Sequence, residues 1–360
     1  MKHQTLLLTA IVLGFGAASS ATAADSWLYV SLLKQKQIVA FERDRESGRL
    51  TKSMTTDCPA EPAAMGFSPN RRCLYVSFRS TGQLAAYKID QSTGKLSLLN
   101  VVDGGDDPAY LQVDRTGTFL LTAYYASNKV CVHRLSDDGT ISEAPVQTVP
   151  TAEKAHGIAI DSKNRTVFVT HTGANRIYQF TFDDKTGHLT ANETPFKQTP
   201  DEDHPRHIVL HPTDNWAYVS NEAGDSIGVY SVKKTKGKLK SRQTVSTIPE
   251  DFDGARNSTA RCELTPDGKF VYVANRGHDS IAAFAIDQIS GDVTLLGQFA
   301  TEQTPRSFSV SSDSRFLYAA GQGSGKVAAF RIRPNGGLER FDTYESGPVS
   351  WWAIVVDTAE

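Results

Sequence analysis

The sequence predicts an all-β protein: one seven-bladed β-propeller, closed by pairing of the N- and C-terminal strands in a single blade. Three observations predict this fold. Three short signals recur seven times in the same order, the repeat length is roughly 48 residues, and the two ends of the chain hold complementary parts of one repeat. Stacks of helices are excluded, because the repeating segments alternate with a period of two residues and carry turn glycines.

Each repeat carries the same three signals. The first is a strand with an aromatic or apolar triplet, and its copies begin at Leu28, Leu74, Phe119, Val167, Ala217, Val271 and Leu317. The second is an aliphatic–x–x–aromatic strand, and its copies begin at Ile38, Leu84, Val130, Ile177, Ile227, Ile281 and Val327. One of these copies has His133 in the aromatic position. The third is a turn glycine followed two residues later by an aliphatic residue, and its copies are Gly48, Gly94, Gly139, Gly187, Gly237, Gly291 and Gly336.

A further strand precedes the triplet, and it often opens with proline. These prolines are Pro62, Pro108, Pro205, Pro305 and Pro348. Four short strands in a repeat of this length are typical of a propeller blade. The first blade begins directly with its second strand, at Trp27, and the chain ends with an extra first strand over residues 347–356. Joining the two pieces in one sheet closes the ring of blades and leaves no open seam in it.

The N-terminal segment has the features of an export signal. Lys2 is a short basic region, residues 6–15 are an apolar stretch too short to span a bilayer, and Ala21-Thr22-Ala23 fits a cleavage site. We therefore expect residues 1–24 to be a signal peptide, residues 25–360 to form the propeller, and the protein to be periplasmic or secreted. The alternative is an uncleaved membrane anchor. No later segment is long enough for a transmembrane helix.

Charge and cysteine content narrow the function classes. The chain has 38 basic and 40 acidic residues, and no run of Lys and Arg stands out beyond residues 233–240. Nucleic-acid binding therefore has no electrostatic basis. The cysteines match no zinc or redox spacing. We expect Cys58, Cys73, Cys131 and Cys262 to be buried free thiols, with a Cys58–Cys73 disulfide as the alternative that export would permit.

Propeller geometry brings two rings of residues to one face. The first strand of each blade lines the channel, so the starts of first strands and the ends of second strands converge where a ligand would meet several blades. At the starts lie Ala63, Ala109, His156, Arg206, Ala260, Arg306 and Val349. At the ends lie Leu33, Arg79, Tyr124 or Tyr125, Thr172, Glu222, Arg276 and Gln322.

The ionisable members of these rings suit lactone hydrolysis. A lactone carbonyl becomes an oxyanion when water attacks it, and arginine can stabilise that charge through paired N–H donors. His156 or Glu222 could accept the proton of water as general base. We therefore predict four catalytic residues: His156, Arg206, Glu222 and Arg276. We assign substrate binding to Arg306, Gln322, His207 and Arg79, and expect neither a metal nor another cofactor.

Structural roles are the alternatives for several of these residues. His156 could be a structural histidine at a strand start, and Arg206 could simply pair with Glu222 across the loop. Asp225-Ser226 and Asp279-Ser280 are typical turn residues. A metal site is disfavoured: His171, His204 and His207 scatter over the predicted strands. A calcium site formed by Asn221, Glu222 and Asn275 is also disfavoured, because adjacent strand residues point opposite ways.

Several segments resemble the seven-bladed lactonase family, which contains the propeller-type 6-phosphogluconolactonases and the fungal-type carboxymuconate cyclases. The segments that carry the resemblance are Pro205-Arg206-His207 with His211-Pro212, residues 265–276, Asp279-Ser280-Ile281, and residues 304–308 with Ala320-Gly321-Gln322. The resemblance covers essentially the whole mature chain. It implies the same catalytic set, His156, Arg206, Glu222 and Arg276. Two residues depart from the family pattern near the expected site: Arg261, where an acidic residue is usual, and His204, where glycine is common.

These observations lead to three functional hypotheses. The first is a lactone hydrolase that acts on a small sugar-type lactone without a cofactor. Export favours an unphosphorylated substrate, because phosphorylated sugar lactones are cytoplasmic metabolites. The alternatives are a muconate-type cycloisomerase acting on an organic acid and a non-catalytic binding propeller of the cell envelope. We expect the protein to be monomeric.

Overall fold

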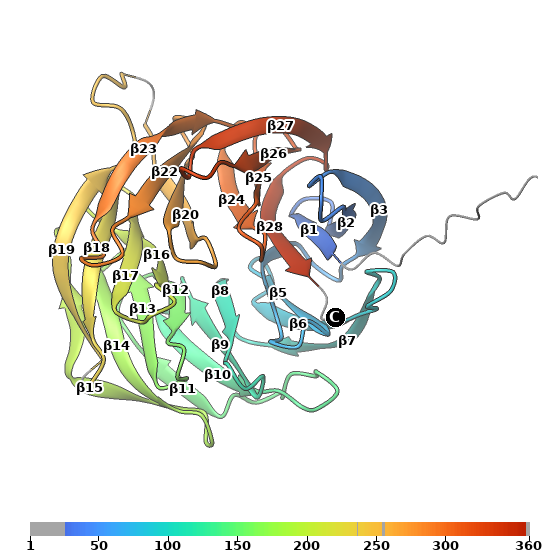
Figure 1. The fold of residues 1–360 in the computed structure, drawn as a ribbon. Helices are drawn as coiled ribbons and strands as arrows, with labels where there is room; N and C mark the ends of the chain where they lie inside the picture. Colours follow the sequence, from blue (N-terminus) through green and yellow to red (C-terminus); the bar gives the residue numbers. More distant parts are fainter. Residues whose placement is uncertain (1–25, 236, 254–255, 358–360) are drawn as a thin grey trace, which may run out of the picture.

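The computed structural model describes residues 26–235, 237–253 and 256–357, and these residues form seven blades around one channel (Figure 1). Each blade is an antiparallel sheet of four strands, and no helix occurs in the described ranges. The predicted all-β seven-bladed propeller is therefore confirmed. The predicted signal peptide lies outside the described residues. Within them, no helix is long and apolar enough to cross a membrane.

The strands of each blade follow one another from the channel outward, and the first blade joins the two ends of the chain. Blade 1 contains β28 (Ser350–Asp357), β1 (Ser26–Leu32), β2 (Gln37–Arg43) and β3 (Leu50–Asp57). Blade 2 contains β4 (Pro62–Phe67), β5 (Cys73–Phe78), β6 (Gln83–Ile89) and β7 (Leu96–Asp103). Blade 3 contains β8 (Pro108–Val113), β9 (Phe119–Tyr124), β10 (Lys129–Arg134) and β11 (Gln147–Pro150).

The remaining blades follow in chain order. Blade 4 contains β12 (Ala155–Ile160), β13 (Thr166–His171), β14 (Arg176–Asp183) and β15 (His188–Gln198). Blade 5 contains β16 (Pro205–Leu210), β17 (Trp216–Asn221), β18 (Ser226–Lys233) and β19 (Lys238–Ser246). Blade 6 contains β20 (Thr259–Leu264), β21 (Phe270–Asn275), β22 (Ser280–Ile286) and β23 (Val293–Ala300). Blade 7 contains β24 (Pro305–Val310), β25 (Phe316–Gly321), β26 (Lys326–Ile332) and β27 (Leu338–Glu345).

The ring closes as predicted, through the pairing of β1 with β28. A buried ion pair adds to this closure, with Nη2 of Arg43 lying 2.6 Å from Oδ1 of Asp357. The closing strand begins at Ser350 rather than at residue 347, so the predicted start is wrong by three residues. The reason lies in Val349, whose φ of 55° is incompatible with an extended strand.

The repeated tyrosine and glycine signals meet between blades. In five of the seven junctions the tyrosine of the triplet donates a hydrogen bond to the carbonyl oxygen of the next blade's turn glycine. These pairs are Tyr29–Gly94, Tyr75–Gly139, Tyr218–Gly291, Tyr272–Gly336 and Tyr318–Gly48. At Gly291 the backbone has a φ of 76°, and a Cβ atom would lie 2.3 Å from the Trp216 ring. Only glycine fits such a position.

The four cysteines are free and buried, which confirms the predicted thiols and excludes the Cys58–Cys73 disulfide. Burial raises the pKa of Cys58 and of Cys262 to about 11, so both stay protonated at neutral pH. The cysteines therefore pack as small apolar side chains.

Candidate active site

A β-bulge near the start of each inner strand orients six of the seven residues of the first predicted ring. The prediction is wrong in blade 1, where the bulged residue is Trp351 and Val349 lies before the strand. In β16, Arg206 has no partner between the pairs Pro205–Asn221 and His207–Ser220. In β12, His156 and Gly157 together oppose one residue of β13. The other five inner strands have the same irregularity. A bulge bends the strand and redirects its side chains, so this ring owes its orientation to a repeated backbone feature.

Glycine at position 157 lets blades 4 and 5 approach closely beside His156. A Cβ atom there would lie 2.5 Å from the carbonyl oxygen of Arg206. That oxygen accepts a hydrogen bond of 2.5 Å from Oγ1 of Thr170. The backbone of Arg206 is therefore held by the neighbouring blade.

Glu222 and Arg276 follow the second strands of blades 5 and 6. Nη2 of Arg276 donates a hydrogen bond to Oε1 of Glu222. Nε of Arg206 lies 3.4 Å from the same oxygen. The backbone positions Arg276 through the carbonyl oxygens of Ser258 and Thr259, at 3.4 Å from Nε and 3.2 Å from Nη2. One carboxylate thus lies between two guanidinium groups from two blades.

A cavity of about 290 Å³ opens above this cluster. The residues that line it are Tyr125, Lys154, Thr172, His204, Glu222, Ala223 and Arg256. Of the predicted catalytic set, only Glu222 lines the cavity. Arg206 and His156 are buried, with 2% and 3% exposure, and the Arg276 side chain is 15% exposed beside Glu222.

The cluster carries an excess of positive charge in a buried setting. Burial and the charge of Arg276 lower the pKa of Arg206. Burial alone would raise the pKa of Glu222, but Arg206 and Arg276 outweigh it and the pKa lies below its ordinary value. Burial and Arg206 hold the pKa of His156 well below 6.5. At neutral pH the carboxylate is therefore ionised and the imidazole is neutral.

Three rings from separate blades cross the channel beneath the cluster. His207 of blade 5 lies 5.2 Å from Tyr110 of blade 3 and 5.8 Å from Trp352 of blade 1, between ring centroids. Tyr110 and Trp352 are 5.8 Å apart. His156 contacts this layer through His207, at 5.1 Å. We call these three side chains the aromatic layer; none of them lines the cavity beside Glu222.

The predicted substrate-binding residues occupy the expected face, but none of them lines the cavity. Arg79 forms a two-point ion pair with Asp107, with 2.9 Å between Nη2 and Oδ2. The Arg306 guanidinium stacks 3.7 Å from the centroid of the Trp351 ring. Gln322 follows β25 and donates its backbone N–H to the carbonyl oxygen of Thr304. His207 belongs to the aromatic layer.

Comparisons with known proteins agree with this architecture. Residues 27–354 match the family described as "Lactonase, 7-bladed beta-propeller". The chain belongs to this lactonase family. A 6-phosphogluconolactonase of Enterobacter sp. (strain 638) is 32% identical over 332 residues, covering 91% of this chain and 98% of the relative. A 6-phosphogluconolactonase of Pectobacterium carotovorum is 31% identical, with the same coverage.

The solved structure of a periplasmic gluconolactonase of Pseudomonas aeruginosa matches with a TM-score of 0.85 and 23% identity, covering 93% of this chain and 99% of the other. At this level of identity the likeness shows the fold. The family match and the two 6-phosphogluconolactonase relatives thus confirm the predicted family resemblance. The structural match also confirms the propeller fold.

Some residues that line the cavity of this lactonase-family chain are not among the predicted site residues. Lys154 directly precedes β12, and Arg256 lies in the long connection between β19 and β20. Neither residue lies at the start of a first strand or the end of a second strand, the two sets of positions that the aligned repeats predict. The repeat could have predicted Lys154, because it holds in blade 4 the position that His204 holds in blade 5. Both residues have positive φ values, 59° and 52°.

The two departures from the family pattern lie in different places. His204 lines the cavity, and its Nδ1 lies 2.7 Å from the carbonyl oxygen of Thr172. Because a carbonyl oxygen only accepts, Nδ1 must carry the proton. Arg261 does not line this cavity, contrary to the expectation that it lies near the site. It extends below the aromatic layer, where Nε donates 2.8 Å to Oε2 of Glu263.

Metal ligands are not grouped in the described part of the chain: no three His, Cys, Asp or Glu side chains cluster there. Asn221 and Asn275, named as possible calcium ligands, instead donate to the hydroxyls of Ser226 and Ser280 and so support their turns.

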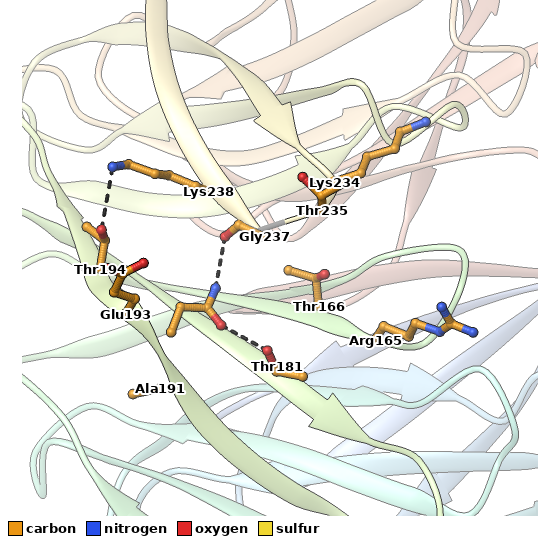
Figure 2. A pocket seen from close by; sticks show the side chains of 11 residues that line it. Arg165, Thr166, Thr181, Ala191, Glu193, Thr194, Lys234, Thr235, Gly237 and Lys238 are labelled. Atoms are coloured by element: carbon orange, nitrogen blue, oxygen red, sulfur yellow. Dashed lines mark hydrogen bonds between the residues drawn. The ribbon is translucent and has the colours of Figure 1, made fainter.

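A wider cavity lies on the opposite face, at the outer edge of blades 4 and 5 (Figure 2). It has a volume of about 780 Å³, and its side chains bond mainly to their neighbours, as Lys238 does to Thr194. Among the described residues that line it, Glu193 is the one acidic residue beside three basic ones, Arg165, Lys234 and Lys238. Its described lining holds no carboxylate paired with two arginines as Glu222 is, so we place the candidate chemistry at the channel.

Proposed function

We propose that this protein is a lactone hydrolase that acts on a sugar-type lactone in the cavity at the end of the channel. Membership of the lactonase family supports this, as do the two relatives named 6-phosphogluconolactonase, which it matches over nearly their whole length. The observation that carries the proposal is the single Glu222 carboxylate that lines the cavity between Arg206 and Arg276.

Arg276 is the proposed oxyanion-stabilising group. Its Nε and Nη2 bond to protein oxygens, whereas no hydrogen bond within the described residues engages Nη1. Arg276 does not itself line the cavity, but its side chain is 15% exposed beside Glu222, which does, so Nη1 can donate to the lactone carbonyl oxygen as negative charge develops on it. Fixed donors of this kind act strongly, because they need no reorganisation during the reaction.

Glu222 is the proposed general base, since it lines the cavity and His156 does not. The carboxylate accepts a proton from water, the water oxygen bonds to the carbonyl carbon, and the bond from that carbon to the ring oxygen breaks. The ring oxygen then takes the proton back from Glu222, which leaves a hydroxy acid and an unchanged enzyme. When Arg276 bonds to the oxyanion, it stabilises the Glu222 carboxylate less, so the pKa of Glu222 rises and it accepts the proton more readily.

A lactone panel tests this proposal. Purified protein should open glucono-δ-lactone or its 6-phosphate faster than buffer alone, with the released acid followed by pH indicator. Including both substrates decides whether the exported protein prefers the unphosphorylated lactone. A muconate-type diacid, followed by ultraviolet absorbance, tests the cycloisomerase alternative. No excess rate on any lactone would refute the hydrolase proposal.

Export is a separate proposal that rests on the sequence of residues 1–24. We expect the mature chain to begin near Ala24 and to be found outside the cytoplasm as a monomer. N-terminal sequencing of protein from fractionated cells and light scattering of the purified protein test these points. A chain that retains Met1 in the cytoplasmic fraction would contradict export.

A further inference from the structure

The other end of the channel holds two adjoining cavities that the proposed reaction does not use. Their volumes are about 510 and 290 Å³, and they share four lining residues, Phe67, Arg71, Arg261 and Ile354. Tyr110 and Trp352 line the smaller one, so the aromatic layer separates it from the candidate active site. We call this paired space the lower chamber.

Two arginines face the lower chamber with unused donors. The Arg71 guanidinium stacks 3.8 Å from the centroid of the Phe67 ring, and burial lowers its pKa. Within the described ranges no carboxylate lies within ion-pair distance of Arg71. Arg261 bonds to Glu263 through Nε and lies over Trp352, 4.5 Å from the ring centroid. Its Nη1 is buried, and among the described residues it has no hydrogen-bond partner.

The acidic residues around the chamber are already bonded. Oε1 of Glu263 accepts the backbone N–H of Val310 at 3.0 Å, and Oε2 accepts Arg261. Asp357 pairs with Arg43 and accepts the Ser312 hydroxyl. The groups left without partners are therefore cationic, and a buried cationic donor costs free energy until it meets an anion.

Part of the remaining wall is apolar, beside polar residues such as Gln112 and Ser309. The side chains of Met65, Phe67, Leu111, Val113, Trp352 and Ile354 line the chamber. These apolar side chains can contact the hydrocarbon part of an organic acid, which a bare inorganic ion lacks. Two guanidinium groups match one carboxylate, because arginine presents paired N–H donors to it.

We propose that the lower chamber binds a small organic carboxylate, with the carboxylate between Arg71 and Arg261 and the apolar part against Phe67 and Ile354. This site is distinct from the candidate active site, because the aromatic layer lies between them. It does not depend on the proposed lactonase activity.

Benzoate is a suitable probe, with benzyl alcohol as its uncharged counterpart. We expect saturable calorimetric binding of benzoate to the full protein, no binding of benzyl alcohol, and a shift of the Ile354 methyl resonance on titration. Arg71→Asn should weaken benzoate binding by roughly tenfold or more. Asparagine tolerates the φ of 60° at this position, so the backbone should be retained. Arg71→Lys should restore part of the affinity.

Arg72→Asn is the matched control, because Arg72 is the adjacent, exposed arginine and the substitution removes the same charge. It should leave benzoate affinity unchanged, and Arg71→Asn should leave the rate of lactone opening unchanged. The proposal is overturned if wild-type protein shows no saturable benzoate binding, or if Arg71→Asn and wild type bind equally. It is also overturned if the shifted resonances belong to residues around the Glu222 cavity instead of Ile354.

Discussion

Glu222 and Arg276 occupy the same position in successive blades, and their side chains form an ion pair across the blade junction. Each directly follows the asparagine that ends the second strand of its blade, Asn221 in blade 5 and Asn275 in blade 6. A propeller places equivalent positions side by side around its channel, so opposite charges at one such position must meet. Arg206 then adds a second cation to the same carboxylate oxygen.

Arg276→Lys tests whether catalysis needs the planar N–H donors of the Arg276 guanidinium as well as its positive charge. Lysine keeps a cation beside Glu222 but cannot bond Thr259, Glu222 and a ligand in one plane. We expect kcat for lactone opening to fall by about 100- to 1,000-fold, as for loss of an oxyanion donor. Arg242→Lys is the control, because Arg242 is also ion-paired, bonding Asp292 through Nε and Nη2, and does not line the cavity. Equal activity of both variants would contradict the role of Arg276.

The pH profile of kcat/KM tests the protonation states at the site. Arg206 and Arg276 lower the pKa of Glu222 below 4.5, outweighing the effect of burial, and burial holds the pKa of His156 well below 6.5. Both groups lose their proton-accepting form only at low pH. Activity should therefore stay constant as pH falls through 6.5 and decline only well below it. An acid limb centred near 6.5, measured after correction for spontaneous opening, would contradict this assignment.

His133→Phe should remove part of the acid sensitivity of folding. His133 is buried in the position where other blades place an aromatic ring, and burial with nearby Lys129 lowers its pKa to about 4. The unfolded chain binds the proton more readily, with an ordinary pKa of 6.5, so stability is present above 6.5 and is lost as pH falls toward 4. The contribution is up to roughly 3 kcal/mol.

Chemical denaturation at a series of pH values measures this effect. At about pH 4 to 5, near the lowered pKa of His133, the unfolding free energy of the variant should equal or exceed that of wild type. Between pH 4 and 6.5 it should also depend less steeply on pH. A slope identical to that of wild type would show that His133 is not the acid-sensitive group.

Tyr218→Phe tests the bonds between blades. The Tyr218 hydroxyl donates 3.0 Å to the carbonyl oxygen of Gly291, and its loss leaves that buried oxygen without a donor. We expect a loss of about 1–3 kcal/mol of unfolding free energy. Tyr178→Phe is the control, because no hydrogen bond of the Tyr178 hydroxyl occurs in the described residues. Thermal denaturation with equal losses for both variants would contradict the inter-blade role.

Repetition explains how much of this protein the sequence predicts. Seven copies of each signal are enough to register the blades, so the ring, its closure and the meeting of Arg206, Glu222 and Arg276 on one face follow from local patterns. The Arg206–Glu222 pairing, which the sequence suggests as a structural alternative, is present, and both cations share that carboxylate. The turn roles of Asp225 and Asp279 also hold, with φ values of 44° and 51°.

Other features depend on contacts that no single repeat records. The aromatic layer joins Tyr110, His207 and Trp352 across the channel, and which side chains meet there depends on the diameter of the closed ring. Arg79 is held by Asp107, a residue in the loop before the next blade. The bulges that aim His156 and Arg206 are register shifts between paired strands, which residue patterns do not reveal.

Whether Glu222 is the general base is decided by the rate of lactone opening by Glu222→Gln, measured beside wild type under conditions where both are folded. Glutamine keeps the shape of the side chain but can neither accept the proton of water nor neutralise Arg206 and Arg276. We expect a clear excess over buffer for wild type and a loss of most of that excess in Glu222→Gln. A variant that opens the same lactone at the wild-type rate would contradict it.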